Sequence, residues 1–360
     1  MIAFSEFGFP KSHAAAFGLL AYQSAWLRHY HPVEYYVALF NNQPMGFYSI
    51  DALGRDAMRN GIEMRLPDVN VSDVWCTVEP SQGSVPRGHA AGNKGAVRIG
   101  LGFVRHWSEE TSTATVEERE QNGPFKSVGD FIRRAPPKLK RTAIEALMWV
   151  GGCDGFGLTR RELLWQVGLW LPPKASQSGD GRGRRQLELA LNHPHEQLAF
   201  GGLAAHERLL AEYAMLGFSA SAHPLSLVRN ALPPGLTLNR DLESLKAGVN
   251  CQVAGLVVAR QRPETAKGTV FLLVEDETGM TNVIVRTDVY DRYRAAVRGE
   301  PFVLVRGKLA KDDGTVNVLA EEVSGLQTDI RKVDATRHTP HAFSFLRAMR
   351  RVAPDSKDWG

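Results

Sequence analysis

The stretch Lys267-Gly268-Thr269-Val270-Phe271-Leu272-Leu273-Val274-Glu275-Asp276-Glu277-Thr278-Gly279 decides the fold of the last third of this 360-residue chain. Its apolar centre, 270–274, has the length and content of a strand, and turn-forming residues bound it on both sides. Similar runs, also bounded by turn signals, occupy 251–259, 281–286, 302–309 and 316–320. Between 281–286 and 302–309, the segment 288–297 has helical spacing. The sequence therefore predicts five short strands with a helix between the third and the fourth.

This order of elements is that of the oligonucleotide-binding barrel, the OB-fold. The quoted stretch closely resembles the second strand and turn of that fold in polymerases and tRNA synthetases. Such barrels bind single strands through a cationic groove and stacking aromatic side chains. The candidates for binding single-stranded template DNA are Arg260, Arg262, Lys267, Phe271 and Arg286. Because exposed aromatic positions are few, a barrel that is mainly structural or binds protein is the alternative.

A basic window, 126–161, precedes the barrel and holds eight cationic side chains against three carboxylates. Within it, 139–149 has helical spacing, Gly151-Gly152 interrupts it, and 159–165 resumes it. This pattern resembles a helix-hairpin-helix, which binds DNA phosphates through hairpin amides and a helix N-terminus. The candidate DNA-binding residues are Lys138, Lys140, Arg141, Gly151, Gly152, Thr159, Arg160 and Arg161. The alternative is a plain helical pair with a solvated charged face.

The amino-terminal stretch Phe7-Gly8-Phe9-Pro10-Lys11-Ser12-His13-Ala14-Ala15-Ala16-Phe17 has the residues of a helix start. Ser12 is placed to cap the following amides, and Lys11 adds a cation where the helix dipole favours an anion. We therefore expect a helix N-terminus suited to a phosphate, with an ordinary capped core helix as the alternative. The helix continues, stops at His31 and restarts at Pro32, a residue suited to a first turn.

These helices closely resemble the fingers region of the bacterial C-family DNA polymerases, the alpha subunits of DNA polymerase III. The segments 43–49, 56–61 and 66–70 look like the error-prone, damage-associated branch of that family, and the resemblance runs from Phe4 to about Leu326. It implies that Lys11, Ser12 and His13 lie where the fingers close on the incoming nucleotide. It also implies that His13 is the steric gate that selects the sugar.

Two further segments, 105–110 and 166–170, are compared with features of the same polymerase family. After 97–104 the family has a glycine-flanked hairpin, but here 105–110 holds no glycine and two carboxylates, so we expect it to be structural. The segment 166–170, Gln-Val-Gly-Leu-Trp, resembles a sliding-clamp-binding peptide, and 197–200 does so more weakly. The alternative is that 166–170 simply ends the helix that begins at Arg160.

Paired carboxylates that would hold two metal ions for phosphoryl transfer are not visible in the sequence. The resemblance therefore implies that the palm and the amino-terminal phosphoesterase-like domain lie upstream, and that this chain is a carboxy-terminal part. We expect no catalytic or metal-binding residue and no cofactor in this chain, with Mg²⁺ needed by the complete polymerase. Alone, the chain should not polymerise. The other hypothesis is a stand-alone nucleic-acid-binding or polymerase-recruitment module.

Composition is that of a globular protein, with 43% hydrophobic and 23% charged residues. No apolar run reaches membrane-spanning length and no signal-peptide order opens the chain, so we expect a cytoplasmic protein without a membrane partner. Cys76, Cys153 and Cys251 are far apart and are expected to be reduced and structural. The formal charge of +4 is too small to indicate a nucleic-acid partner by itself.

The predicted fold class is multidomain α+β: a helical fingers and helix-hairpin-helix region followed by a small five-stranded barrel. The predicted domains are fingers 1–75, helix-hairpin-helix 76–171, linker and helical connector 172–247, barrel 248–326 and basic tail 327–360. Within them, 80–94 is expected to be a mobile loop, 172–185 a linker, and the tail disordered or partner-bound. The expected partners are primer–template DNA, single-stranded template, the missing polymerase domains and damage-inducible accessory subunits.

Overall fold

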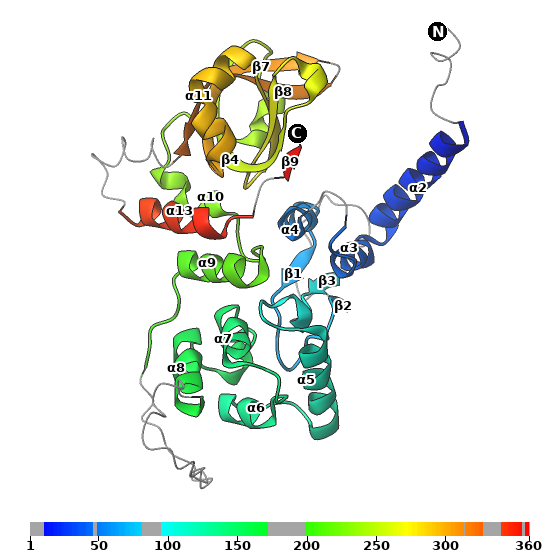
Figure 1. Ribbon diagram of the computed structural model, residues 1–360, viewed down its shortest axis with the longest axis vertical. Coiled ribbons are helices and arrows are strands. Elements are labelled where there is room, and N and C mark those ends of the chain that lie inside the picture. Colours follow the sequence, from blue (N-terminus) through cyan, green and yellow to red (C-terminus); the bar gives the residue numbers. More distant parts are fainter. Residues whose placement is uncertain are drawn as a thin grey trace.

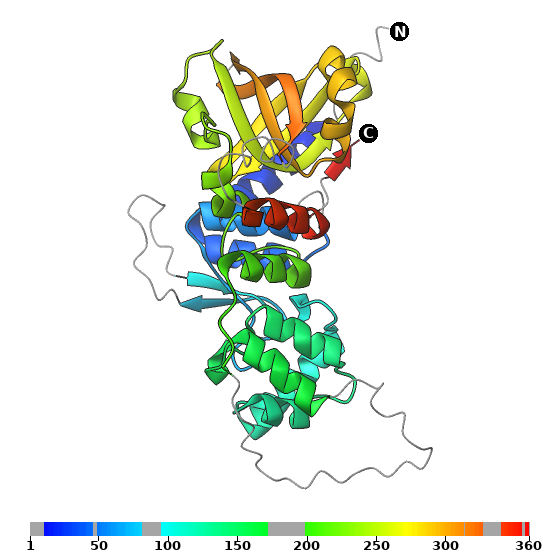
Figure 2. The same cartoon turned by 90° about the vertical axis from the view of Figure 1, so that its left-hand side faces the viewer.

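A helical body and a β-barrel are stacked along the long axis of the computed structural model (Figures 1 and 2). The structure describes residues 11–45, 49–80, 95–171, 199–312, 314–326, 340–354 and 357–359. Apart from Pro80, the predicted loop 80–94 and the predicted linker 172–185 lie outside the described residues. The predicted fold class, a helical region followed by a five-stranded barrel, is confirmed.

Helices α2 (Lys11–Tyr30) and α3 (Pro32–Asn41) open the described chain. The predicted interruption is confirmed, because His31 separates the two helices and Pro32 is the first residue of α3. Helix α2 begins at Lys11, so Ser12 lies in its first turn and not at the N-cap position expected for it. Helix α4 (Ile50–Arg59) follows, and the side chain of Ser49 caps it.

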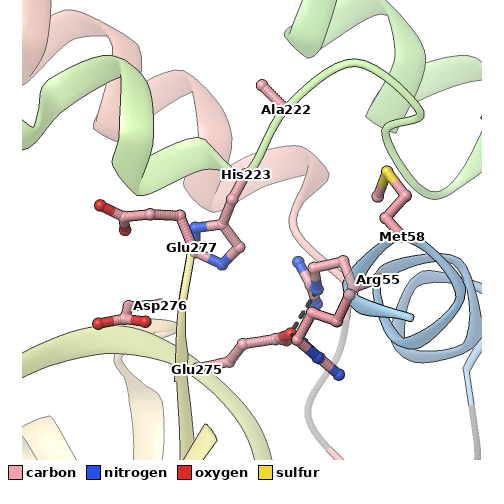
Figure 3. Close-up of a pocket in the computed structure, with 8 residues that line it drawn as sticks. Arg55, Met58, Ala222, His223, Glu275, Asp276 and Glu277 are labelled. Carbon is pink, nitrogen blue, oxygen red and sulfur yellow. Dashed lines mark hydrogen bonds and ion pairs between the residues drawn. The ribbon is translucent and has the colours of Figure 1, made fainter. Parts of the chain in front are cut away.

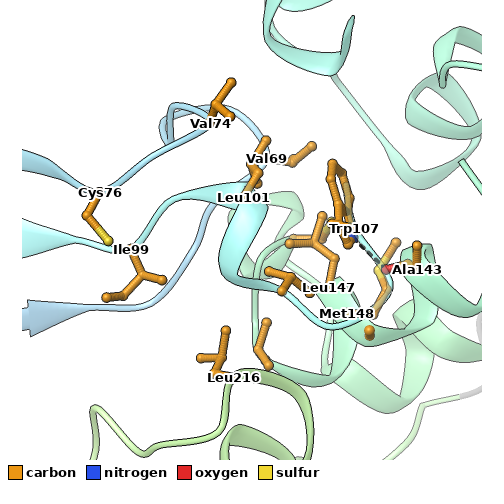
Figure 4. Packing of buried hydrophobic residues seen from close by; sticks show 14 of the residues in the cluster. Val69, Val74, Cys76, Ile99, Leu101, Trp107, Ala143, Leu147, Met148 and Leu216 are labelled. Atoms are coloured by element: carbon orange, nitrogen blue, oxygen red, sulfur yellow. Dashed lines mark hydrogen bonds between the residues drawn. The ribbon is translucent and has the colours of Figure 1, made fainter. Parts of the chain in front are cut away.

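One hydrophobic core runs through the helical body. It is built by a small sheet and four further helices: β1 (Glu63–Arg65), β2 (Thr77–Pro80), β3 (Gly95–Arg98), α5 (Glu109–Asn122), α6 (Val128–Arg134), α7 (Arg141–Trp149) and α8 (Arg160–Trp170). Figure 4 shows Trp107 in this core, where its indole nitrogen donates to the Ala143 carbonyl at 2.8 Å. Val74 and Cys76 both belong to the core. The core is therefore continuous across the boundary predicted at residue 75.

The barrel consists of β4 (Asn250–Gln261), β5 (Val270–Asp276), β6 (Gly279–Val285), β7 (Phe302–Asp312) and β8 (Thr315–Gly325), with α11 (Thr287–Gly299) between β6 and β7. The strand order is β5-β6-β8-β7-β4, and β4 also pairs with β5, which closes the barrel. Strand β4 pairs with β7 along its first half and with β5 along its second, and the pairing with β5 shifts register between Val257 and Ala259. All five predicted strands and the predicted helix are confirmed.

Helices α9 (Ala205–Leu216), α10 (Pro224–Val228) and α13 (Pro340–Val352) lie between the two bodies, and Figure 2 shows α9 and α13 side by side. The prediction of a disordered or partner-bound tail is wrong for α13, because Phe345, Leu346 and Met349 are buried against α9 and α10. Their spacing places them on one helix face, which an average composition of the tail conceals. The strand β9 (Lys357–Trp359) then pairs in parallel with β4.

Short 3₁₀ turns complete the secondary structure: η1 (Leu101–Phe103), η2 (Asp154–Phe156), η4 (Arg229–Ala231), η5 (Asn239–Ser244) and η6 (Glu264–Ala266). None of the described helices is long and apolar enough to cross a membrane. All three cysteines are buried and unpaired, as expected of structural thiols. Burial raises the pKa of the Cys76 thiol to about 12, so that thiol stays protonated at neutral pH.

Candidate nucleic-acid interface

The hairpin between α7 and α8 is closely packed. Gly151 has a φ of +88°, and a Cβ at this position would collide with the guanidinium of Arg160. A Cβ on Gly152 would collide with the side chain of Leu147. The two glycine amides donate within the chain, Gly151 to the Met148 carbonyl at 3.1 Å and Gly152 to that of Leu147 at 2.8 Å. The two glycines therefore make room for side chains, and their predicted approach to a phosphate stays a prediction.

Arg160 and Thr159 hold this hairpin together. The buried guanidinium of Arg160 donates to the Asp154 carboxylate at 3.0 Å and to the Trp149 carbonyl at 3.0 Å. Thr159 caps α8 by accepting from the Glu162 amide, while the Glu162 carboxylate accepts from the Thr159 amide at 2.8 Å. Arg160 thus stabilises the hairpin through these two partners, and the phosphate contact predicted for it stays a prediction.

Two more of the predicted cations are held by neighbouring carboxylates. Arg141 lies 2.6 Å from Glu145 and also donates to the Leu171 carbonyl. Arg161 lies 2.7 Å from Glu207, which ties α8 to α9. Their charges are therefore partly balanced within the helical body.

The exposed cations Lys138 and Lys140 lie at the start of α7. Lys140 occupies the N-cap position, where no side chain caps the helix, and the first turn of α7 carries no acidic residue. Lys138 forms an exposed ion pair with Glu110 at 2.5 Å, a kind of pair worth only about 0–1 kcal/mol. Uncapped amides, the helix dipole and two exposed cations coincide here. This end of α7 is the part of the predicted DNA-binding set best placed to meet a phosphate.

The segment 105–110, which we expect to be structural, runs from beyond η1 into the first turn of α5. Ser108 caps α5, and Glu109 and Glu110 occupy the first turn, where a phosphate would otherwise be attracted. His106, at the apex, is exposed and has a φ of +70°, a left-handed conformation that favours glycine. No pattern in the sequence marks this conformation.

Three of the five predicted barrel residues gather at one end of the barrel. The guanidinium of Arg262 lies over the ring of Tyr290 at 4.7 Å. The carbonyl of Lys267 accepts from the Thr287 hydroxyl at 3.0 Å, which joins the β4–β5 loop to the start of α11. Arg286 is the exposed N-cap residue of α11. Arg286 also lies 3.5 Å from the Asp288 carboxylate, so one of these three cations is paired within the barrel.

The other two barrel candidates lie elsewhere. Arg260 donates to the carbonyls of Val297 and Glu300 at 2.8 and 2.6 Å, so it fastens β4 to the end of α11 and is not part of that group. Phe271 is half-buried in β5, opposite Gln261 of β4 and Ile284 of β6. Its two cross-strand neighbours are thus one polar and one aliphatic side chain.

The predicted nucleotide-binding residues Lys11, Ser12 and His13 lie at the start of α2, the end that points away from the helical body in Figure 1. The ring of His13 lies 4.4 Å from that of Phe17, one turn along the same helix. The structure does not bring these three residues together with the cations of α7 or of the barrel.

The clamp-binding candidate 166–170 forms the end of α8, which confirms the alternative reading of that segment. Val167 is fully buried, and the Trp170 ring packs against Gly129. These side chains are therefore not available as an extended peptide. Of the weaker candidate 197–200, only Ala199 and Phe200 lie among the described residues.

A buried charge cluster joins α4 to the barrel; we call Asp51, Arg55, Arg59 and Glu275 the clasp. Arg55 pairs with Asp51 and lies 2.7 Å from Glu275 of β5, which also pairs with Arg59. Asp51, Arg55 and Glu275 are exposed by only 1%, 5% and 0%. The Tyr213 hydroxyl accepts from Arg55 at 3.0 Å. Sequence reasoning missed the clasp, although the four-residue spacing of Asp51 and Arg55 was a signal.

A hollow of about 230 Å³ lies beside the clasp, lined by Arg55, Met58, His223, Asp276 and Glu277 among others (Figure 3). His223 caps α10 by accepting from the Leu225 amide at 3.2 Å. Burial, reinforced by nearby arginines, lowers the pKa of His223 well below its usual value. Burial raises the pKa of Asp51 to about 6 and also raises that of Glu275, with Arg55 opposing both shifts. His223 is therefore neutral at physiological pH.

Metal ligands do not gather in the part of the chain that the structure describes: no three His, Cys, Asp or Glu side chains there could hold one ion. The donor set that Mg²⁺ requires for phosphoryl transfer is not found among these residues.

Two family models match the chain. Residues 61–163 match a helix-hairpin-helix motif, and residues 251–325 match the OB-fold nucleic acid binding domain. Together with the fold, these matches show a helix-hairpin-helix region and an OB-fold domain in one chain.

Curated proteins with similar sequences are error-prone DNA polymerases. The chain is 39% identical to the error-prone DNA polymerase of Anaeromyxobacter sp. (strain K) over 328 residues, which are 91% of this chain and 28% of the relative. It is 36% identical to the error-prone DNA polymerase of Methylococcus capsulatus, over 88% of this chain and 30% of the relative. Error-prone DNA polymerases therefore match this chain over about nine tenths of its length, and the chain spans less than a third of the length of these relatives.

Solved structures are similar over a smaller part of the chain. Asparaginyl-tRNA synthetase from Pyrococcus horikoshii is 19% identical, with a TM-score of 0.23, over 26% of this chain and 23% of that one. A hypothetical protein from E. coli is 20% identical, with a TM-score of 0.21, over 26% of this chain and 91% of its own.

Proposed function

We propose that this chain is the DNA-binding carboxy-terminal region of an error-prone DNA polymerase that acts in translesion synthesis and repair of damaged DNA in the cytoplasm. The helical body would hold the primer–template duplex at the start of α7, and the end of the barrel that carries Arg262, Lys267 and Arg286 would hold the single-stranded template. The observation that carries the proposal is the joining of these two matched domains in one chain that is 39% identical to such a polymerase.

Nucleotidyl transfer would belong to a palm outside this chain, with Mg²⁺ held there. Lys11, Ser12 and His13 would meet the incoming nucleotide, Lys11 through the triphosphate and His13 through the sugar. Damage-inducible accessory subunits would recruit the complete enzyme. In an assembled polymerase, His13→Ala should raise ribonucleotide incorporation relative to deoxyribonucleotide incorporation. An unchanged sugar preference would remove His13 from that role.

The DNA-binding role is tested with the double variant Lys138→Ala, Lys140→Ala. Phosphate contacts carry no base information, so affinity for duplexes of unrelated sequence should fall by a similar factor. The slope of log affinity against log salt should flatten by up to about two units if both lysines meet phosphates. Fluorescence anisotropy of labelled primer–template measures both.

The matched control is Lys246→Ala, Lys311→Ala, which removes two exposed charges from the barrel side of the molecule. It should leave the salt slope for duplex close to that of the parent. If both double variants change binding equally, only net charge matters and the start of α7 is not a site. If the parent binds neither duplex nor single strand, the proposal fails as a whole.

A further inference from the structure

Strands β5 and β6 present an outer face that the described structure leaves partly exposed. Alternate residues of both strands are buried in the barrel core, and their neighbours point outward. Strand pairing sets these outward side chains in rows, with Phe271 beside Ile284 and Leu273 beside Asn282. Leu319 of β8, which is 38% exposed, extends the first row. The second and third strands are the usual oligonucleotide-binding face of an OB-fold, and here they offer apolar side chains on which bases can stack.

This face runs from the β4–β5 loop to the helical body. The loop carries Arg262 and Lys267 and adjoins the start of β5. At the other end Glu275 lies beside Met280, four residues of strand and about 13 Å from Phe271. The arginines of the clasp hold Glu275 there against α4. A single strand that enters at the loop therefore reaches the helical body after a few nucleotides.

A hollow of about 490 Å³ lies beyond the last row, where Met280 forms part of its wall. Pockets that bury small organic ligands have volumes of about 300–1,000 Å³. The apolar lining comes from α3, the segment that follows it, α4 and β6: Tyr35, Tyr36, Leu39, Met45, Ala52, Leu53 and Met280. Two aromatic rings in an apolar wall suit a planar ligand with apolar faces.

Charged side chains border the same hollow. The Asp56 Oδ2 accepts from the Tyr36 hydroxyl and from Arg28. The Asp56 Oδ1 lies 3.8 Å from the Arg59 Nη2, which is too far for a hydrogen bond. That oxygen can accept from the amino group of a base, and Arg28, which is 46% exposed, can pair with a phosphate. An apolar wall, an acceptor and an exposed cation together match a nucleotide better than they match an apolar side chain.

We propose that this hollow binds one unstacked base of the single-stranded template, where the strand passes from the barrel to the helical body. The proposal rests on the single-strand role in the proposed function and adds a defined site to it. The base lies against Tyr35, its amino group donates to Asp56, and its phosphate meets Arg28. The bases on the barrel side of it stack on the row that contains Phe271.

The test uses the full chain and a primer–template with a single-stranded template overhang of about ten nucleotides, which is within the range that OB-folds cover. The duplex fixes the register, and an abasic residue replaces one overhang nucleotide at a time. Fluorescence anisotropy measures each affinity. Loss of a base that stacks on the protein should weaken binding by about tenfold, and we call this loss the abasic penalty of that position.

Two variants identify the position whose base enters the hollow. Met280→Trp fills the hollow with an indole and keeps a residue that suits a strand, and Tyr35→Leu removes the ring but keeps an apolar side chain. Each should weaken binding of the intact overhang by about tenfold. At one position, the same for both variants, the abasic penalty should fall to about twofold or less, because the base and the hollow act as one interaction. The penalties at the other positions should persist.

The matched control is Val249→Trp, which adds the same indole at a site that is 41% exposed and outside the hollow. It should leave every abasic penalty within about twofold of the parent's. Urea unfolding checks that all three variants are folded. Abasic penalties that neither hollow variant changes would overturn the proposal, and so would penalties that fall equally at every position.

Blunt duplex separates this proposal from the proposed function. If the overhang adds affinity but the hollow variants change no abasic penalty, the single-strand role of the barrel stands. The base site alone is then overturned, and the hollow belongs to another occupant, such as an apolar side chain of a protein. If the overhang adds no affinity over blunt duplex, the single-strand role of the barrel and the base site both fail.

Discussion

Replacing Arg55 by Met should destabilise the protein more than any other single change in the clasp. The guanidinium is the one cation that contacts both Asp51 and Glu275, and both carboxylates are almost completely buried. Removing one partner from a buried ion pair costs about 3–5 kcal/mol, because the remaining charge is left without compensation. Methionine fills similar space, so the loss of packing adds little.

The matched control is Arg59→Met. Its side chain is 25% exposed, and Glu275 would keep Arg55 as a partner, so this change should cost about 1 kcal/mol or less. Urea unfolding followed by circular dichroism and by tryptophan fluorescence measures both variants. Calorimetry should show the Arg55→Met transition lower by roughly 6–20 °C, if about 150–250 residues unfold as one unit.

The dependence on pH provides an independent check. Without Arg55 the pKa values of Asp51 and Glu275 should rise further, and protonation would then neutralise the uncompensated charges. The deficit of Arg55→Met should therefore be smaller at about pH 5 than at about pH 8. A deficit below about 1 kcal/mol, or one that is the same at both pH values, would refute this account of the clasp.

Three further predictions concern other parts of the molecule. Folding lowers the pKa of His223, so the folded protein favours its neutral imidazole. This preference leaves stability unaffected above about pH 6.5, and the protein loses stability as the pH falls below that value. His223→Asn keeps an acceptor for the cap of α10 but cannot be protonated. As the pH falls from about 7 to 5, its urea midpoint should therefore rise relative to that of the parent. Parallel pH profiles of the two proteins would contradict the lowered pKa of His223. His106→Gly should stabilise the fold by about 0.5–1 kcal/mol, since it relieves a left-handed residue at some cost in chain entropy; a lower melting temperature would show that His106 makes a needed contact. The isolated chain should not extend a primer with Mg²⁺ and all four nucleotides, and template-dependent extension by the pure chain would place the catalytic carboxylates within it.

The sequence by itself determined the elements and their order. The apolar strand at 270–274, four similar runs and one helical segment were enough for the barrel, because strand and helix periods differ and turn residues separate them. Pro32 determined the start of α3, since its ring suits a first helical turn. The resemblance to error-prone DNA polymerases could also be recognised from the sequence, because it depends on short local motifs.

Only the tertiary structure decided which side chains hold the fold together. Gly151, Gly152 and Arg160 match a DNA-binding hairpin in the sequence, yet the folded chain uses the two glycines to admit side chains and the arginine to bind Asp154. Arg55 and Glu275 are more than two hundred positions apart in the chain, so no local pattern could pair them. A side chain's role depends on its neighbours in space, and long-range contacts choose those neighbours after the local elements have formed.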